Sequence, residues 1–442
     1  MLSVVVAVAG MTLLLGTCVL GSRYRLRLFL LALLLLVSAL AIAVDWTGLV
    51  QIRRYTDPLA ERQDILFGAI ASALAAVSLL GGGRDGVRAR WGGAVTSLLA
   101  MLIYAGVVRL YHTGAVDGAL TIVLAVIVVP ATYTTFFRVA EGLGGLRSVV
   151  RLFILVGYVW IGMSFVQFAI DPGALVDGGR FMGLLGNPQH AAAMLAMLIT
   201  LCAWLAANDR RTGAVISGVA GCGFLLMLFW TGSRTGMLMA IIGVGVALLP
   251  RLGRLAILAP VGGGALIVLI SLAQRLNIEL RTSRLTSLQD TRSQNWMMMI
   301  RQFYESPLLG VGTKGLAENS YLAAGATFGI GMVMLMIIFL IACGVMIWRA
   351  WSQRSTDGPD REAAAVLVVA GTLAYLAGAM FEAYLFARTT YMLVFIVFFA
   401  GVYGRYFLEA SAEEAVLEDD GEADPDDPWF DDHAPATAGT PV

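Results

Sequence analysis

The sequence predicts an all-α, polytopic integral membrane protein with about 12–13 transmembrane helices. Of its 442 residues, 59% are hydrophobic and only 14% are charged, whereas a soluble domain is charged at about a quarter of its positions. Apolar runs recur along the chain, and each has the ~20 residues needed to cross a hydrocarbon layer. These observations exclude a soluble globule, a disordered chain, a collagen and a disulfide scaffold.

The apolar runs give the order of the predicted spans. Backbone polar groups must be paired inside lipid, and the runs are too long and uniform for barrel strands, so each should be a helix. The first run has no basic n-region and no small-residue cleavage site, which indicates a retained helix rather than a signal peptide. The predicted spans are 2–20, 28–44, 65–81, 93–110, 115–137, 149–170, 188–207, 212–230, 235–249, 255–274, 319–348, 363–385 and 390–408.

The basic residues predict how the chain is oriented. One set of alternate loops holds 17 Arg and Lys residues, whereas the other holds seven in its short loops and six in the long connection 275–318. Because cytoplasmic loops carry the excess of basic residues, we expect the N-terminus and the long connection to lie outside. The tail 409–442, with 12 of the chain's 30 acidic residues, should be disordered and cytoplasmic.

These boundaries divide the chain into four predicted regions. They are N-terminal transmembrane helices (1–174), a core that includes the outer loop 275–318 (175–345), C-terminal transmembrane helices (346–408) and the acidic tail (409–442). The four cysteines lie inside apolar runs, where a thiol usually acts as a small hydrophobe. No cysteine or histidine has partners at metal-ligand spacing, so the sequence predicts neither a metal site nor a cofactor.

Two short polar segments on the predicted outer face suggest an anion site. In GGRFMGLLGNPQH, Asn187 is a candidate N-cap and Pro188 a candidate first helical residue, so the partly positive helix start would face outward. Arg180 precedes it, and Ser233 and Arg234 occupy a tight turn. Each arginine could be an interface anchor whose charge reaches water, but together they favour phosphate binding.

The outer loop contains an amphipathic helix. Between 291 and 307, Trp296, Met299, Ile300, Phe303 and Tyr304 recur at helical spacing and define one apolar face. Such a helix could simply pack on the membrane surface, and we also expect its arginines, Arg292 among them, to cover a cavity.

Glu318 immediately precedes Asn319 and the next span. It could be a carboxylate favoured by the helix dipole, or a general base for an incoming hydroxyl, because a carboxylate is ionised at neutral pH. His190 is the rival base, although a single histidine at a helix start is more often a hydrogen-bonded interface residue. Lys314, the chain's only lysine, lies in the glycine-containing turn before Glu318.

At these residues the sequence resembles the O-antigen ligase and O-antigen polymerase superfamily of bacterial membrane glycosyltransferases. The similar segments are Arg180 with GNPQHAAAML, then TGSRTGML, RSQNWMMMIRQFYESPLLGVG and ENSYLAAGATFGIG. They occur in the family's order and cover about 175–345, whereas the N-terminal third is similar only as generic membrane helices.

The resemblance implies a metal-independent transferase with a type C-like membrane fold. Such enzymes take a glycan from an undecaprenyl diphosphate carrier at the outer face of the bacterial inner membrane. Ligases attach it to lipid A-core, and polymerases attach it to another lipid-linked repeat unit. By position, Arg180 and Arg234 look like the family's diphosphate-binding arginines. Glu318 stands where ligases have a histidine, and Gln189 stands where an asparagine is common.

We therefore expect an inverting glycosyltransferase of the O-antigen or exopolysaccharide polymerase type, with an O-antigen ligase as the alternative. The candidate catalytic residues are Glu318, Arg234 and Arg180, and the candidate substrate-binding residues are Asn187, His190, Ser233, Arg292, Asn319 and Lys314. The expected partners are the lipid-linked donor, a glycan or lipid A-core acceptor and membrane lipids, with no nucleic acid.

Two rivals remain. A lipid-linked oligosaccharide transporter would need ionisable residues near the middle of its spans. Most spans here have none there, and the polar groups gather outside. A scaffold-like wall-synthesis protein, also a lipid-linked sugar polymerase, would carry different motifs.

Overall fold

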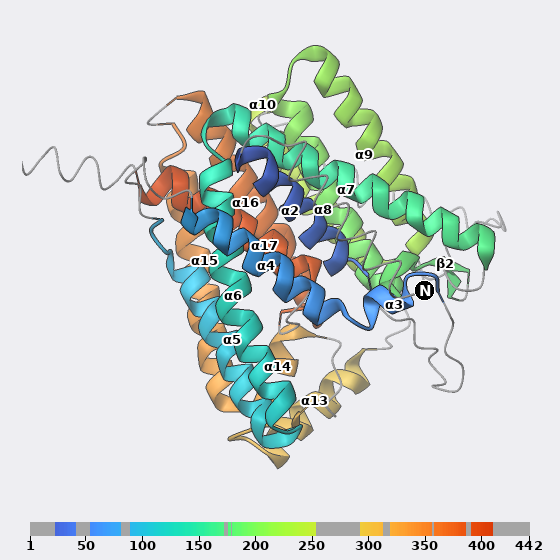
Figure 1. Ribbon diagram of the computed structural model, residues 1–442, viewed down its shortest axis with the longest axis vertical. Coiled ribbons are helices and arrows are strands. Elements are labelled where there is room, and N and C mark those ends of the chain that lie inside the picture. Colours follow the sequence, from blue (N-terminus) through green and yellow to red (C-terminus); the bar gives the residue numbers. More distant parts are fainter. Residues whose placement is uncertain are drawn as a thin grey trace, which may run out of the picture.

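The computed structural model describes residues 23–40, 54–80, 89–171, 176–177, 179–252, 292–312, 319–355, 358–385 and 390–409, which form a bundle of helices (Figure 1). The predicted spans 2–20 and 255–274, the acidic tail after Glu409, Lys314 and Glu318 lie outside these residues. The elements are α2 (Arg23–Ser38), α3 (Asp57–Ala60), α4 (Gln63–Leu80), α5 (Gly93–His112), α6 (Ala115–Val139), α7 (Gly142–Ile170), β1 (Val176–Asp177), β2 (Arg180–Phe181), η2 (Gly183–Leu185), α8 (Pro188–Asn208), α9 (Arg211–Thr231), α10 (Arg234–Leu252), α13 (Ser293–Glu305), α14 (Ser320–Phe328), α15 (Ile330–Ser352), α16 (Pro359–Ala379), α17 (Tyr391–Tyr403) and η5 (Gly404–Leu408).

The prediction of an all-α polytopic membrane protein is confirmed. Within the described ranges, nine helices are long and apolar enough to cross a membrane: α5 to α10, α15, α16, and α17 continued by the π-helical turn η5. The apolar helix α4 is shorter. The strands β1 and β2 form one antiparallel pair of two residues each.

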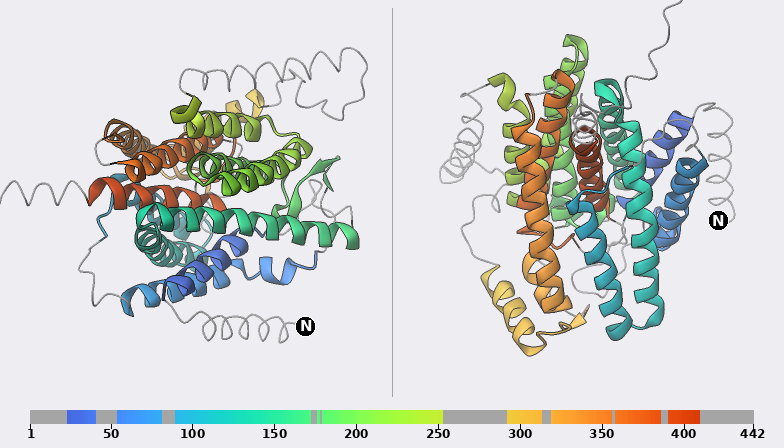
Figure 2. Two further views of the ribbon diagram at one scale, coloured as in Figure 1. Left: turned by 90° about the horizontal axis from the view of Figure 1, so that it is seen from above. Right: turned by 90° about the vertical axis from the view of Figure 1, so that its left-hand side faces the viewer.

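Three helices form the centre of the bundle. The residues of α8, α16 and α17 are mostly buried around their whole circumference, whereas most residues of α9 and α15 are exposed or only partly buried. A helix that is apolar on all sides is either enclosed by other helices or faces lipid. Figure 2 shows α17 passing through the middle of the bundle, with α7 and α16 on either side.

The predicted span 319–348 is corrected by the structure, which divides it into α14 and α15. Gly329, between them, has a φ of 77°, and an added Cβ there would collide with the carbonyl oxygen of Leu308. The junction of the two helices contacts the turn that follows α13, because Ile330 N donates to Pro307 O. With nine residues, α14 is too short to cross a bilayer.

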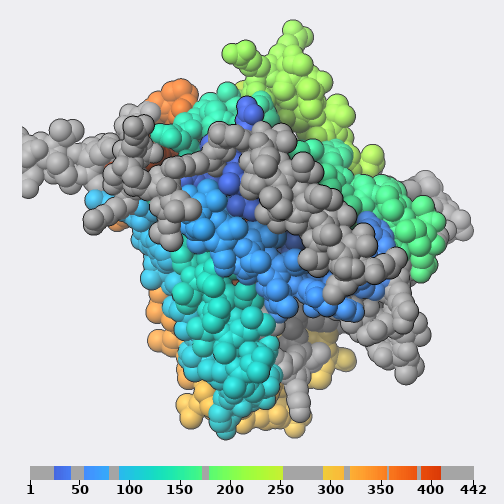
Figure 3. Space-filling model, in the orientation of Figure 1, coloured from blue at the N-terminus to red at the C-terminus, as the bar shows by residue number. Residues whose placement is uncertain are grey.

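The amphipathic helix predicted between 291 and 307 is confirmed as α13, and it packs on α14. Met299 is fully buried against Ala323 and Ala326, and Trp296 packs beside them. The packed face is narrower than predicted, because Ile300 and Tyr304 are exposed. Figure 3 shows α13 and the segment after it, in gold, at one end of the molecule beside the teal atoms of α5 and α6.

Candidate functional site

The site is built around the first turn of α8. Asn187 is its N-cap, and its side-chain oxygen accepts a hydrogen bond of 2.8 Å from Gln189 N. Pro188 is the first helical residue, a position that suits its fixed φ and its missing N–H. The partly positive end of α8 therefore begins where the sequence predicted it.

The first turn of α10 lies against the second turn of α8. A Cβ added to Gly236 would come within 2.6 Å of Ala192 Cβ, so only a glycine lets the two turns approach this closely. The Ser233 hydroxyl accepts from Gly236 N at 3.2 Å and caps the helix, and Arg234 is exposed as its first residue. Two helix N-termini thus open side by side, which creates a region of positive potential.

Arg180 lies beside the same turn. Its Nε donates a 2.7 Å hydrogen bond to the carbonyl of Thr231, at the end of α9. Gly232, the next residue, has a φ of 62°, and a Cβ there would lie 3.5 Å from Arg180 Nε. The structure therefore fixes Arg180 against the turn that carries Ser233 and Arg234, although Arg180 lies 51 residues before Thr231 in the chain.

A second cluster surrounds Glu382, which follows α16 and is 3% exposed. Arg292 Nη2 lies 3.3 Å from its Oε1, and Arg292 Nη1 donates to Phe381 O at 2.5 Å. The Gln189 amide orientation that satisfies its neighbours puts Nε2 2.7 and 2.8 Å from the two Glu382 oxygens, and Oε1 3.2 Å from Arg292 Nη2. Because Gln189 is in the first turn of α8, this cluster joins the arginine site.

The starts of α14 and α17 complete the site. Asn319 caps α14 by accepting from Tyr321 N and Leu322 N at 2.8 and 3.1 Å. The hydroxyl of the next residue, Ser320, donates to Glu382 O. The Tyr391 hydroxyl donates a hydrogen bond of 2.6 Å to His190 O. Asn319 and His190 therefore lie at the same end of the bundle as the arginines.

The structure brings seven of the nine candidate site residues to the start of α8 or to the segments that contact it: Arg180, Asn187, His190, Ser233, Arg234, Arg292 and Asn319. It does not describe Lys314 and Glu318. In the described part of the chain, no group of three or more His, Cys, Asp and Glu side chains could hold a metal ion.

Sequence reasoning missed Glu382. Glu382 lies within the predicted span 363–385, but α16 ends at Ala379 and Glu382 follows it. The signal is a single carboxylate near the end of an apolar run, a position where an ionisable residue needs a partner. Its partners, Arg292 and Gln189, are far away in the sequence, so no local pattern identified them.

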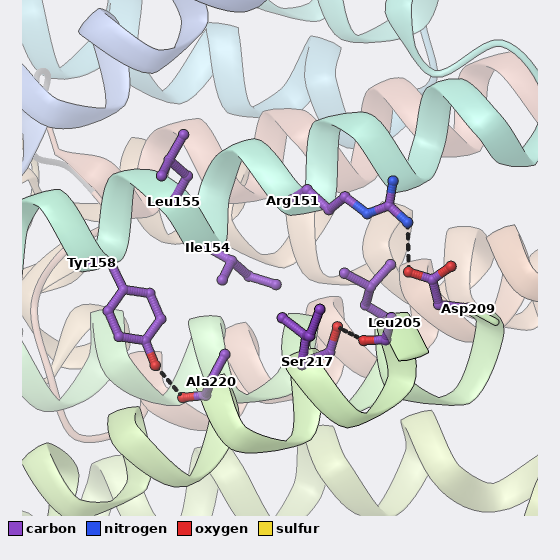
Figure 4. A pocket seen from close by; sticks show the side chains of 10 residues that line it. Arg151, Ile154, Leu155, Tyr158, Leu205, Asp209, Ser217 and Ala220 are labelled. Carbon is purple, nitrogen blue, oxygen red and sulfur yellow. Dashed lines mark hydrogen bonds and ion pairs between the residues drawn. The ribbon is translucent and has the colours of Figure 1, made fainter. Parts of the chain in front are cut away.

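A cavity of 420 Å³ lies elsewhere, between α7, α8 and α9 (Figure 4). Arg151 and Asp209 form an ion pair of 2.5 Å there, and the Tyr158 hydroxyl donates to Ala220 O. Partial burial acts to raise the pKa of Asp209, but the Arg151 hydrogen bond and the Arg210 N–H bring that pKa below its usual value. The cavity adjoins the last turn of α8, about 30 Å along the helix from Asn187, and is separate from the arginine site.

Comparison with known families supports the predicted resemblance. Residues 220–331 match the family model described as O-antigen ligase, which supports placing the chain in the O-antigen ligase and polymerase superfamily. The matched segment contains Arg234, Arg292, Lys314, Glu318 and Asn319, whereas Arg180 and the start of α8 precede it. No curated protein matches the chain.

Proposed function

We propose that the chain is a membrane glycosyltransferase of the polymerase type. It would transfer glycan repeat units from an undecaprenyl-diphosphate-linked donor at the outer face of the inner membrane. The observation that most supports this is the pairing of the α8 and α10 N-termini with Arg180 and Arg234 beside them. Backbone N–H groups at helix starts and guanidinium groups both bind phosphate oxygens.

The proposed reaction is an inverting displacement. An acceptor hydroxyl attacks the anomeric carbon of the donor on the face opposite the diphosphate, and Glu318 takes the hydroxyl proton. The new glycosidic C–O bond forms as the C–O bond to the diphosphate breaks. Arg180 and Arg234 stabilise the negative charge that grows on the departing diphosphate, which is most effective where the charges are already in place.

The acceptor distinguishes the two related activities. Glu318 in place of the ligase histidine favours another lipid-linked repeat unit as acceptor, and hence a polymerase. The family match to O-antigen ligase supports the alternative, in which lipid A-core is the acceptor. Both alternatives use the same donor site and the same leaving group.

A transporter is less well supported. The charged residues that are buried within the described ranges are Arg54, Arg361 and Glu382. Arg54 precedes α3, Arg361 lies in the first turn of α16, and Glu382 follows that helix. None is near the middle of a membrane helix, where a path for a polar substrate would need ionisable groups.

Reconstitution in proteoliposomes tests the proposal. Purified protein is mixed with the undecaprenyl-diphosphate-linked repeat unit, with or without lipid A-core. We expect longer lipid-linked glycans and release of undecaprenyl diphosphate without lipid A-core. Release only when lipid A-core is present would indicate a ligase. Movement of the donor across the bilayer without release would indicate a transporter and contradict glycosyl transfer.

A further inference from the structure

We infer that Glu382 is a positioning residue for the donor site, where its carboxylate holds Gln189 and Arg292 in place. This inference rests on the proposed glycosyl transfer, since it assigns a role within that site. Gln189 belongs to the first turn of α8, and Arg292 is the N-cap of α13. Glu382 therefore connects the helix start that would bind the diphosphate to the outer helix that packs on α14.

The burial of Glu382 indicates that its charge is compensated. Its side chain is 4% exposed, and an ionised carboxylate out of water is strongly unfavourable unless it is paired and hydrogen-bonded. Arg292 provides the opposite charge at 3.3 Å, and Gln189 Nε2 reaches both carboxylate oxygens. Removal of this carboxylate would take an opposite charge away from the partly buried Arg292 guanidinium.

The arrangement fixes the Arg292 guanidinium on several sides. One Nη donates to Phe381 O and the other faces Glu382, while Arg292 Cζ lies 5.5 Å from the centre of the Phe381 ring. The adjacent Gln189 Oε1 also accepts from Nη2. A guanidinium held in this way loses little conformational freedom when an anion binds nearby, and such preorganisation increases affinity.

The same contacts explain why Glu382 is assigned a positioning role rather than a proton transfer. Both carboxylate oxygens accept from Gln189, and Oε1 also faces Arg292. The Glu382 backbone carbonyl accepts from Ser320, next to the α14 cap. The residue thereby joins α8, α13, α14 and the connection from α16 to α17 around one point. Its loss should weaken donor binding more than it slows the chemical step.

The test measures the kcat and the KM for the lipid-linked donor in proteoliposomes. We expect Glu382→Gln to raise this KM about tenfold and to change kcat less than about threefold. Glu382→Asp, which keeps the charge, should recover part of the lost affinity. The matched control is Glu305→Gln, which removes the exposed ion pair of Glu305 with Arg301 on α13 and should leave both constants unchanged.

A double-mutant cycle separates positioning from general damage to the fold. If Glu382 acts through Arg292, the KM of the double variant Arg292→Gln/Glu382→Gln should equal the higher of the two single-variant KM values, because the effects of interacting residues do not add. Additive effects, or an equal fall in kcat at unchanged KM, would overturn the inference. If Glu382→Gln does not fold, Glu382→Asp decides the matter: the shorter carboxylate should raise the donor KM with kcat little changed, and an unchanged KM would overturn the inference.

The outcomes also distinguish this inference from the proposed function. Transfer by the wild-type protein together with an unchanged KM in Glu382→Gln would overturn the positioning role alone. Failure of the folded wild-type protein to transfer glycan to either acceptor would overturn the proposed function, and the inference with it.

Discussion

The two arginines of the proposed diphosphate site are held differently. Arg180 is fixed through its Nε to the end of α9, so its position depends on the turn at Gly232. Arg234 is exposed at the first position of α10. A guanidinium provides several donors in one plane and matches phosphate geometry in a way that an ammonium group does not. Both residues therefore suit a leaving group with several charged oxygens.

Replacement of Arg234 tests this assignment. Arg234→Ala should lower the rate of glycan transfer about 10²–10³-fold, because a preorganised donor to the leaving group is lost. Arg234→Lys should retain part of the rate, since the charge remains but the planar fork does not. Release of undecaprenyl diphosphate in proteoliposomes measures both variants.

The matched control for Arg234 lies on the same helix. Arg251 is exposed in the last turn of α10, at the opposite end from the site, so Arg251→Ala should transfer at the wild-type rate. Normal transfer by a folded Arg234→Ala variant would exclude a role for this guanidinium.

Glu318 is the proposed general base, and its replacement should affect the chemical step. Glu318→Gln should lower kcat about 10²–10⁴-fold, the usual contribution of a positioned base, while binding of undecaprenyl diphosphate stays unchanged. Single-turnover transfer and a separate binding titration measure the two effects. A variant with normal kcat would assign the proton transfer to another group.

Three residues predicted to bind substrate also have a local structural role. Asn187, Ser233 and Asn319 each use a side-chain oxygen to cap the helix that follows. An N-cap usually contributes about 1 kcal/mol to stability. Their sequence signal therefore reflects helix initiation. The three caps place the partly positive starts of α8, α10 and α14 at the end of the bundle that holds the arginines.

At the scale of single elements, α13 illustrates what a periodic pattern can and cannot give. The spacing of apolar residues identified the helix and its packing face. It could not show that Met299 would be fully buried while Ile300 and Tyr304 remain exposed, because that depends on the small residues Ala323 and Ala326 of α14. The spacing also did not predict the break at Gly329, because apolar residues continue on both sides of it.

Packing of α13 on α14 should be necessary for activity. Met299→Asp would bury a carboxylate against the apolar side chains of Ala323 and Ala326, which is unfavourable by several kcal/mol. We therefore expect α13 to detach from α14. We expect transfer to fall at least tenfold. The neighbouring Met298 is 44% exposed, and Met298→Asp should have little effect. Equal activity of the two variants would show that the site functions without docked α13.

At the scale of the whole molecule, hydropathy predicted the architecture well. Eight of the predicted spans correspond to helices of membrane-crossing length within the described residues, and a ninth, 319–348, contains such a helix only after Gly329. Apolar length is a property of each segment alone, which is why hydropathy detects it. The Glu382 cluster was not predictable in this way. Its side chains come from α8, the start of α13 and the end of α16, and only the packing of the bundle brings them together.

The orientation of the chain remains a prediction from its basic loops, and the site depends on it. Two separate cysteine substitutions test the orientation when a membrane-impermeant maleimide is added to intact cells. A cysteine at exposed Tyr304 on α13 should react, whereas one at Arg354 after α15 should not, because the bias of basic residues places that turn inside. The reverse pattern would put the arginine site on the cytoplasmic face.

The central claim is that the adjacent starts of α8 and α10, with Arg180 and Arg234, bind a diphosphate. The most direct measurement is a titration of purified protein with undecaprenyl diphosphate. Undecaprenol, which has no phosphate, is the control ligand. We predict that the wild-type protein binds the diphosphate selectively and that Arg180→Gln/Arg234→Gln loses at least tenfold in affinity, since each charge-assisted hydrogen bond contributes about 1.5–3 kcal/mol. Equal affinity of the wild-type and double variant for undecaprenyl diphosphate would contradict the account.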